Sequence, residues 1–323
     1  MWSRALGKPY LAHNWLIVVG EAQSRAMEQT RSSAALAVIG FIIIACALAS
    51  NTIVARANAG EVPSFSLAFF RWAIVAVGLA PFSLREIGAK WPAISPRLRM
   101  VAAAGFCGMF LCGGPVYLAG VTTTAINIGL IFAATPVNVL LIAWCIGLEK
   151  IKPVQVVSIA VALPGVGLIL ARGSLETLST VNFAAGDILV VIAMLGWTTY
   201  NLLQVSTLPE VSSISRTCLF AFAGAVFSLP FCLHEALAAP QAVFSARAFL
   251  TYLFAAIVPG IGAYAGLAYL AATFGSVRAS LMTYVVPIAS VLLSMLFLGE
   301  GPSAYHFIGG LLILAGVWLS VRR

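Results

Sequence analysis

Arg71 is the one charged residue of this sequence that lies well inside an apolar run, about seven residues from the nearer end of that run. A guanidinium left alone in hydrocarbon is costly, so its side chain must reach the interface, pair with carbonyl oxygens or a helix end, or face a wet cavity. Two kinds of chemistry follow. Arg71 either braces neighbouring helices or presents a positive charge to the carboxylate of a small solute.

The other groups that could move a proton or bind a metal lie at the ends of apolar runs or in the N-terminal tail: Glu149, Asp187, Glu300, His13, His234 and His306. No HExxH pair occurs, and no nucleophile is paired with a histidine at similar depth. The six cysteines lie in apolar segments without metal-ligand spacing. We therefore expect no metal, no cofactor, no enzyme activity and no carboxylate that relays protons through the membrane.

The elements that position these residues must be membrane-spanning helices. Hydrophobic residues make up 61% of the 323 residues and charged residues 9%, far below the roughly one quarter that is typical of globular domains. Apolar runs of about 20 residues are long enough to cross a hydrocarbon core, and they lack the alternation of barrel strands. We predict an all-α integral membrane protein with ten transmembrane helices, near residues 34–54, 64–82, 99–119, 125–147, 153–171, 187–205, 213–233, 247–272, 277–298 and 303–320.

Orientation in the membrane explains the formal net charge of +8 better than nucleic-acid binding does. If the N-terminus is cytoplasmic, only Arg56, Arg172 and Arg247 lie between spans on the outer side. The positive-inside rule then predicts that both termini are cytoplasmic in the cell inner membrane, with residues 1–32 as a cytoplasmic tail. Expected partners are the lipid bilayer and a small-molecule substrate, without nucleic acid, and we expect a functional monomer.

A repeated figure divides the spans into two sets of five. Pro136 and Glu149 recur as Pro287 and Glu300, 151 residues further along the chain. Other pairs keep nearly the same offset: Asn51 with Asn201, Tyr117 with Tyr269, and Gly165 with Gly316. Because five is an odd number, the second set must enter the membrane from the opposite side. We predict two inverted five-helix repeats, residues 33–172 and 173–323, around a central cavity.

Three motifs accompany this arrangement: Ser50-Asn51 late in the first span, Phe70-Arg71-Trp72 in the second, and a proline helix that ends in Glu before a Gly-rich helix. Together they resemble the EamA-type transporters of the drug/metabolite transporter superfamily. The sequence departs from that family at two places. Leu48-Ala49 stands where Trp-Gly is frequent, and the family's Gly-Glu is kept as Gly299-Glu300 in the second half but is Leu148-Glu149 in the first. The resemblance implies a secondary transporter that exports small organic metabolites, with amino acids first, including aromatic and other neutral ones, by alternating access.

Polar residues on three spans fall into arcs at about 100° per residue, as expected where they line a cavity. These arcs hold Thr124, Asn127, Thr135 and Asn138 on the fourth span, Trp197, Tyr200, Asn201 and Gln204 on the sixth, and Ser276, Ser280, Thr283, Ser290 and Ser294 on the ninth. Interhelical packing gives similar arcs in any bundle. The substrate-cavity candidates are Asn51, Arg71, Tyr117, Asn127, Thr135, Asn138, Trp197, Tyr200, Asn201, Gln204, Tyr264, Thr283, Tyr284 and Ser290.

Pro136 and Pro287 each remove a backbone hydrogen bond, so they are candidates for helix bends, either static or used in gating. With Arg71 as the only cation inside a span, polyanionic substrates are disfavoured. Drugs, nucleosides and other neutral metabolites are alternative substrates, and a channel or an intramembrane enzyme is a further alternative. Because no acid lies in the middle of a span, we expect the substrate gradient to drive transport.

Overall fold

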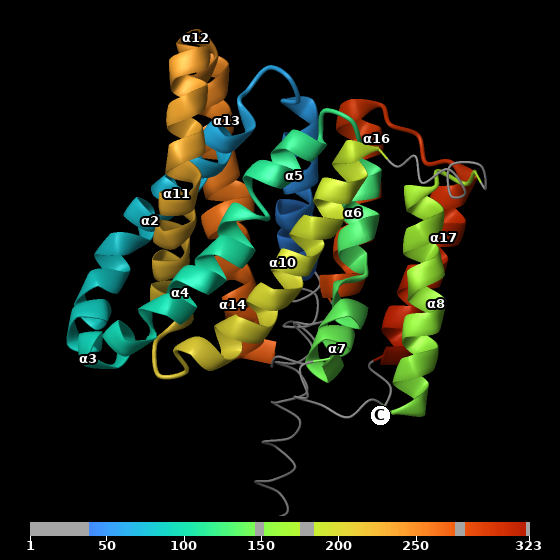
Figure 1. Ribbon diagram of the computed structural model, residues 1–323, viewed down its shortest axis with the longest axis horizontal. Helices are drawn as coiled ribbons and strands as arrows, with labels where there is room; N and C mark the ends of the chain where they lie inside the picture. The colour runs from blue at the N-terminus through green and yellow to red at the C-terminus, as the bar shows by residue number, and fades with distance from the viewer. Residues whose placement is uncertain (1–38, 146–151, 175–183, 275–281, 321–323) are drawn as a thin grey trace, which may run out of the picture. The chain divides into compact units, whose positions relative to one another are not determined.

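The computed structural model describes residues 39–145, 152–174, 184–274 and 282–320, and every regular element within these ranges is helical (Figure 1). The helix Ile39–Ala57 comes first. The others, in chain order, are α2 (Ser64–Ala89), α3 (Trp91–Ile94), η1 (Ser95–Arg97), α4 (Leu98–Gly105), η2 (Phe106–Phe110), α5 (Gly114–Ala119), α6 (Ala125–Ala133), α7 (Thr135–Cys145), α8 (Pro153–Leu170), α10 (Ala185–Thr207), α11 (Ser213–Ala238), α12 (Pro240–Val243), α13 (Ala246–Ala256), η3 (Ile257–Gly262), α14 (Ala263–Phe274), α16 (Met282–Leu298) and α17 (Ala304–Ser320).

Among the described residues, seven helices are long and apolar enough to cross a membrane, or eight if the bent pair of α6 and α7 is one span. Shorter apolar helices cover Val285–Leu298 and Ala304–Leu319. The prediction of an all-helical membrane protein is therefore confirmed. The count of ten spans and the inversion of the second half stay predictions.

Two helices are longer than the apolar runs predicted. α2 continues beyond residue 82 to Ala89, and α11 continues beyond residue 233 to Ala238. A charged residue ends an apolar run but does not end a helix, and the additional turns hold Glu86 and Glu235.

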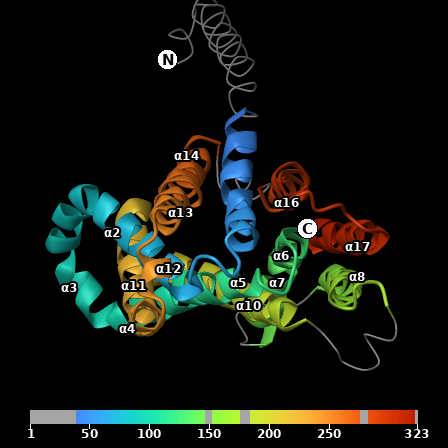
Figure 2. The same ribbon diagram turned by 90° about the horizontal axis from the view of Figure 1, so that it is seen from above.

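α2 and α11 pack side by side in opposite directions (Figures 1 and 2). Glu235, near the end of α11, accepts hydrogen bonds from the backbone N–H of Ser66 at 2.6 Å and from its hydroxyl at 2.8 Å. Glu86, near the end of α2, accepts from the Ser212 backbone N–H at 3.0 Å and from the Ser215 hydroxyl at 2.6 Å. Each carboxylate thus satisfies donors at the start of the other helix, where amides lack intrahelical partners.

α8 and α17 form a second antiparallel pair through glycines (Figures 1 and 2). A Cβ added at Gly165 would lie 2.7 Å from the carbonyl oxygen of Gly309, and one added at Gly316 would lie 2.6 Å from the carbonyl oxygen of Ser158. Only a residue without a side chain allows backbones to approach this closely. These glycines therefore set the distance between the two helices.

Two π-helical segments interrupt otherwise α-helical spans. η2 separates α4 from the turn before α5, and η3 separates α13 from α14. The wider turn of a π segment changes which side chains and carbonyl groups face a neighbour, and such segments are frequent at functional sites. η3 contains Pro259, whose carbonyl oxygen accepts a hydrogen bond from Arg71 in the site described next.

Candidate substrate site around Arg71

Arg71 is buried where several chain segments meet, and the residue is 3% exposed. Its Nη1 donates to Oδ1 of Asn51 at 2.7 Å and to the Tyr117 hydroxyl at 2.6 Å, and its Nη2 donates to the Pro259 carbonyl oxygen at 3.1 Å. The Tyr117 hydroxyl also donates to Oδ1 of Asn51, at 2.9 Å. The guanidinium of α2 therefore joins the helix Ile39–Ala57, α5 and η3.

All three acceptors are uncharged. Within the described ranges, no carboxylate forms an ion pair with Arg71, and its Nε has no hydrogen-bond partner. The guanidinium carbon lies 4.4 Å from the centroid of the Trp72 ring, a cation–π distance. Pairing with neutral oxygens makes burial of the charge tolerable without neutralising it. An anionic oxygen would supply both a counter-charge and an acceptor for Nε.

Aromatic rings extend from Arg71 toward α10. The Trp72 ring meets Tyr264 edge-on with centroids 6.0 Å apart, and Tyr264 meets Trp197 edge-on at 6.3 Å. Trp197 stacks on Tyr200 with centroids 5.0 Å apart. Three predicted cavity residues thus lie together, and Trp72 connects them to Arg71. The sequence placed Trp72 in the motif Phe70-Arg71-Trp72 but not among the cavity candidates, because residue type alone does not separate a lining tryptophan from a packing one.

The amide side chains of α10 bond within their own helix. Nδ2 of Asn201 donates to the carbonyl oxygen of Trp197 at 2.8 Å, and Nε2 of Gln204 donates to Oδ1 of Asn201 at 3.1 Å. Tyr200 is packed against Gly108, where an added Cβ would lie 2.4 Å from its ring. Trp197 and Tyr200 belong to the aromatic series. A cavity-lining role for Asn201 and Gln204 stays a prediction.

The fourth predicted span is broken at Ala134. α6 and α7 differ in direction by 41°, and Pro136 lies in the first turn of α7, where its missing N–H costs little. The Thr135 hydroxyl donates to a carbonyl of the preceding turn at 2.6 Å. Nδ2 of Asn138 donates to the Ala134 carbonyl oxygen at 3.1 Å and lies 3.3 Å from Sδ of Met194 in α10. The bend is present, and its movement during gating stays a prediction.

On the ninth predicted span, Ser276 and Ser280 of the polar arc lie outside the described residues, and so does the side chain of Thr283. The side chain of the cavity candidate Tyr284 is likewise outside the description. Pro287 lies inside α16. Ser290 is buried against Gly129 of α6, where an added Cβ would lie 2.6 Å from Cβ of Ser290. Its hydroxyl has no hydrogen-bond partner among the described residues. The structure thus places Ser290 at a tight contact between α6 and α16.

Asp187, in the first turn of α10, is fully buried. Its Oδ1 accepts from the Thr123 hydroxyl and from Nδ2 of Asn127, the latter at 3.1 Å. Nε2 of His306 lies 3.0 Å from Oδ1 of Asn127, and Nδ1 of His306 accepts from the Ser303 backbone N–H at 2.7 Å. The structure places the cavity candidate Asn127 in this second polar network, at the start of α6.

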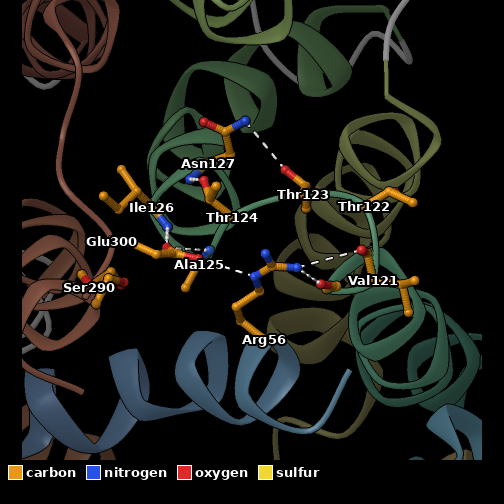
Figure 3. A network of polar contacts seen from close by, with 12 residues as sticks. Arg56, Val121, Thr122, Thr123, Thr124, Ala125, Ile126, Asn127, Ser290 and Glu300 are labelled. Atoms are coloured by element: carbon orange, nitrogen blue, oxygen red, sulfur yellow. Dashed lines mark hydrogen bonds and ion pairs between the residues drawn. The ribbon is translucent and has the colours of Figure 1, made fainter. Parts of the chain in front are cut away.

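Glu300 ties three segments together beside this network (Figure 3). Its Oε2 accepts from the Ala125 backbone N–H at 3.0 Å, at the start of α6, and its Oε1 accepts from Nε of Arg56 at 3.2 Å. Nη1 of Arg56 donates to the Gly120 carbonyl oxygen at 2.8 Å. Glu300 therefore stabilises a helix start, the position where a carboxylate is favoured.

Among the described residues, no three His, Cys, Asp or Glu side chains gather as a metal-ligand set.

A groove of about 500 Å³ lies between the helix Ile39–Ala57 and α13. It is lined by Val54, Asn58, Arg247, Leu250, Thr251 and Phe254. None of these belongs to the predicted cavity set, so a central cavity stays a prediction.

The apolar helices define an integral membrane protein. Residues 35–171 and 184–322 each match the model of the EamA-like transporter family, and together they cover most of the chain. The chain belongs to the EamA-like transporter family, with two copies of its domain. This membership indicates a transporter and not an enzyme.

Several known proteins are similar to the chain. A protein of Archaeoglobus fulgidus named an uncharacterized transporter is 27% identical over 81% of this chain and 89% of its own length. A protein of Streptantibioticus cattleyicolor named a probable terminal-alkyne amino-acid exporter is 28% identical over 80% and 84%. A solved crystal structure with 22% identity superimposes with a TM-score of 0.56 over 90% of this chain and 97% of its own, which supports the fold alone.

Proposed function

We propose that the protein is a secondary transporter that exports small organic metabolites, with amino acids first among them, across the cell inner membrane by alternating access. Arg71 carries the proposal. It is a buried cation held by neutral acceptors, with one unpaired donor and aromatic rings on one side. This combination suits a carboxylate attached to an apolar or aromatic body. The amino-acid exporter named among the similar proteins supports the same substrate class.

The proposed architecture is ten spans in two inverted repeats, residues 33–172 and 173–323, that surround the site within one monomer. Reciprocal contacts between the two halves support this architecture. Glu86 bonds the start of α11 while Glu235 bonds the start of α2, and these glutamates are 149 residues apart. Gly165 and Gly316 play the same reciprocal role between α8 and α17. Repeats related in this way can exchange conformations, so a site between them opens to each side in turn.

In the proposed topology both termini are cytoplasmic. Glu300 and the start of α6 then face outward, together with Arg56, Arg172 and Arg247. Cysteines introduced at Lys90 and at Gln241, near opposite ends of the α2–α11 pair, test this arrangement. A membrane-impermeant thiol reagent added outside intact cells should label only the cysteine at Gln241, and the reverse labelling would contradict the topology.

Counterflow in liposomes tests the substrate class. Purified full-length protein is reconstituted with an unlabelled amino acid inside, and entry of the labelled amino acid is followed for a panel of side chains. We expect saturable counterflow of at least one amino acid. Arg71→Gln should reduce the counterflow of amino acids more than that of uncharged solutes that have no carboxylate. Arg71→Lys keeps the charge but loses the planar fork, so it should be intermediate. Absence of counterflow for every amino acid would contradict the proposal, and single-channel currents would favour a channel.

A further inference from the structure

The two π-helical segments occupy matching positions in the two copies of the family's domain. η2 lies in the first matched copy and η3 in the second. Their first residues, Phe106 and Ile257, are 151 residues apart, which is also the offset between Pro136 and Pro287. π segments are rare and are frequent only at functional sites. Their presence at the same place in both copies therefore indicates a role that the two copies share.

Adjacent residues of α2 bind the two π segments. Nε1 of Trp72 donates to the carbonyl oxygen of Met109 in η2, at 2.9 Å. Nη2 of Arg71 donates to the carbonyl oxygen of Pro259 in η3, at 3.1 Å. Both donor residues are buried, so water cannot replace either bond without a change in structure. One turn of α2 therefore joins the matching segments of both copies.

The aromatic rings of the candidate site lie along the same two segments. Tyr200 packs against Gly108 of η2, and Tyr264 follows η3 directly, in the first turn of α14. The rings of Trp72 and Trp197 both meet Tyr264 edge-on. A movement of either π segment therefore moves rings of the site.

The guanidinium of Arg71 has one edge left for a carboxylate. Each Nη carries two N–H donors and Nε carries one. Both donors of Nη1 are used, by Asn51 and by Tyr117, whereas Nε has no partner among the described residues. A carboxylate that accepts two parallel hydrogen bonds must therefore take Nε and Nη2. Because Nη2 is the nitrogen bound to Pro259, this carboxylate competes with η3 and leaves the other two partners of Arg71 in place.

We propose that η2 and η3 are paired hinges of the transporter, and that Trp72 is a positioning residue that holds η2 as Arg71 holds η3. A substrate carboxylate on Nε and Nη2 of Arg71 replaces the Pro259 carbonyl oxygen and releases η3. η2 stays bound, because its contact runs through Trp72 and not through the guanidinium. Substrate binding therefore loosens one copy of the domain and not the other, as is needed for one repeat to move against its partner.

This inference rests on the proposed function, because it takes the substrate carboxylate as the ligand of Arg71. The contact of Trp72 with η2 can nevertheless be tested without substrate. The release of η3 is tested with substrate, so the two parts of the inference can fail separately.

Hydrogen exchange of the full-length protein in lipid nanodiscs tests the role of Trp72. Trp72→Phe keeps an aromatic ring but removes the N–H donor. Backbone amides of residues 106–110 should therefore exchange several-fold faster, while those of residues 257–262 are unchanged. Trp91→Phe, at a tryptophan that is 47% exposed, is the matched control and should change neither segment. Unchanged exchange at residues 106–110 in Trp72→Phe, or equal acceleration in both segments, would overturn the proposal.

A second variant separates the hydrogen bond from the packing of the ring. Trp72→benzothienylalanine, made by cell-free synthesis, keeps two fused rings but has sulfur where indole carries its N–H. Exchange at residues 106–110 should rise as it does in Trp72→Phe. Exchange at the wild-type rate would show that Trp72 acts by packing alone, and the positioning role would be wrong.

Bound substrate should loosen η3, whereas a ligand that merely fills a site slows exchange around it. L-phenylalanine and L-leucine are the probes, and their amides, which lack the carboxylate, are the controls. Each amino acid should speed exchange of residues 257–262 several-fold and leave residues 106–110 unchanged, and the amides should change neither. In Arg71→Gln, residues 257–262 should exchange fast already and should not respond. Slower or unchanged exchange of these residues with both amino acids would overturn the release of η3.

The outcomes also separate this inference from the proposed function. If no amino acid shows counterflow but Trp72→Phe loosens η2 alone, the proposed function is wrong and the positioning role of Trp72 stands. If amino acids show counterflow but do not speed exchange in η3, the proposed function stands and the release of η3 is wrong.

Discussion

Nη1 of Arg71 lies 2.7 Å from Oδ1 of Asn51, on a different helix. The acceptor is an amide, so it satisfies a donor of the guanidinium without cancelling its charge. An aspartate has nearly the same shape and would form a buried ion pair at this point. The neutral residue preserves a positive charge within the bundle, and the proposed recognition of a substrate carboxylate depends on this charge.

The reciprocal helix-end bonds can be tested on stability. Glu86→Gln and Glu235→Gln should each lower the free energy of unfolding by about 1–3 kcal/mol, because each removes a charged acceptor from a helix start. Glu210→Gln is the control, since its pair with Arg97 is more exposed and should contribute less than about 1 kcal/mol. Thermal unfolding in detergent measures all three, and a loss at only one end of the pair would argue against equivalent halves.

The glycine contact between α8 and α17 predicts a contrast between two glycines. Gly316→Val should destabilise by about 1–3 kcal/mol, because its Cβ would collide with backbone and side-chain atoms of α8. Gly167→Ala, in α8, meets nothing within 4 Å and should be neutral or slightly stabilising. Equal unfolding temperatures for the two variants would contradict the close packing.

Apolar length is a local property, and for this reason the sequence alone predicted helices over most of the described chain. A further pair of matching segments in the two halves was not predicted. The segments PFSLRE at 81–86 and PFCLHE at 230–235 are 149 residues apart, whereas the repeat found first has an offset of 151. Because loops differ in length between the halves, a single offset does not align both.

The partners of Arg71 were predictable only in part. Asn51, Arg71 and Tyr117 were all candidates, and the structure brings them into direct contact. The carbonyl of Pro259 was not, because its availability depends on a π segment that has no sequence signal of its own. The burial of Asp187 likewise depends on helices distant in sequence.

Ser290 should be dispensable for folding. Its hydroxyl is buried without a partner among the described residues, so Ser290→Ala should be neutral or stabilising, whereas Asn138→Ala should cost about 1 kcal/mol by removing a buried amide. Unfolding and counterflow are measured on both variants. If Ser290→Ala abolished counterflow at unchanged stability, Ser290 would contact the substrate and our reading of it as a packing residue would fail.

The driving force of transport can be tested with an imposed pH gradient. With the substrate gradient fixed, removal of an imposed pH gradient should leave the final extent of transport unchanged, because no described acid lies in the middle of a span. A final extent that collapses with the pH gradient would require proton-coupled transport.

Counterflow through Asn51→Asp tests most directly whether Arg71 recognises a substrate carboxylate. The carboxylate can accept the same hydrogen bonds from Arg71 and Tyr117 while cancelling the positive charge, so the fold should survive. We predict that the counterflow of an amino acid falls by about 10- to 100-fold, the loss expected for a charge-assisted hydrogen bond. The counterflow of an uncharged solute without a carboxylate, where the wild type carries one, should fall much less. Amino-acid counterflow at the wild-type rate in Asn51→Asp would contradict recognition of the substrate carboxylate by Arg71.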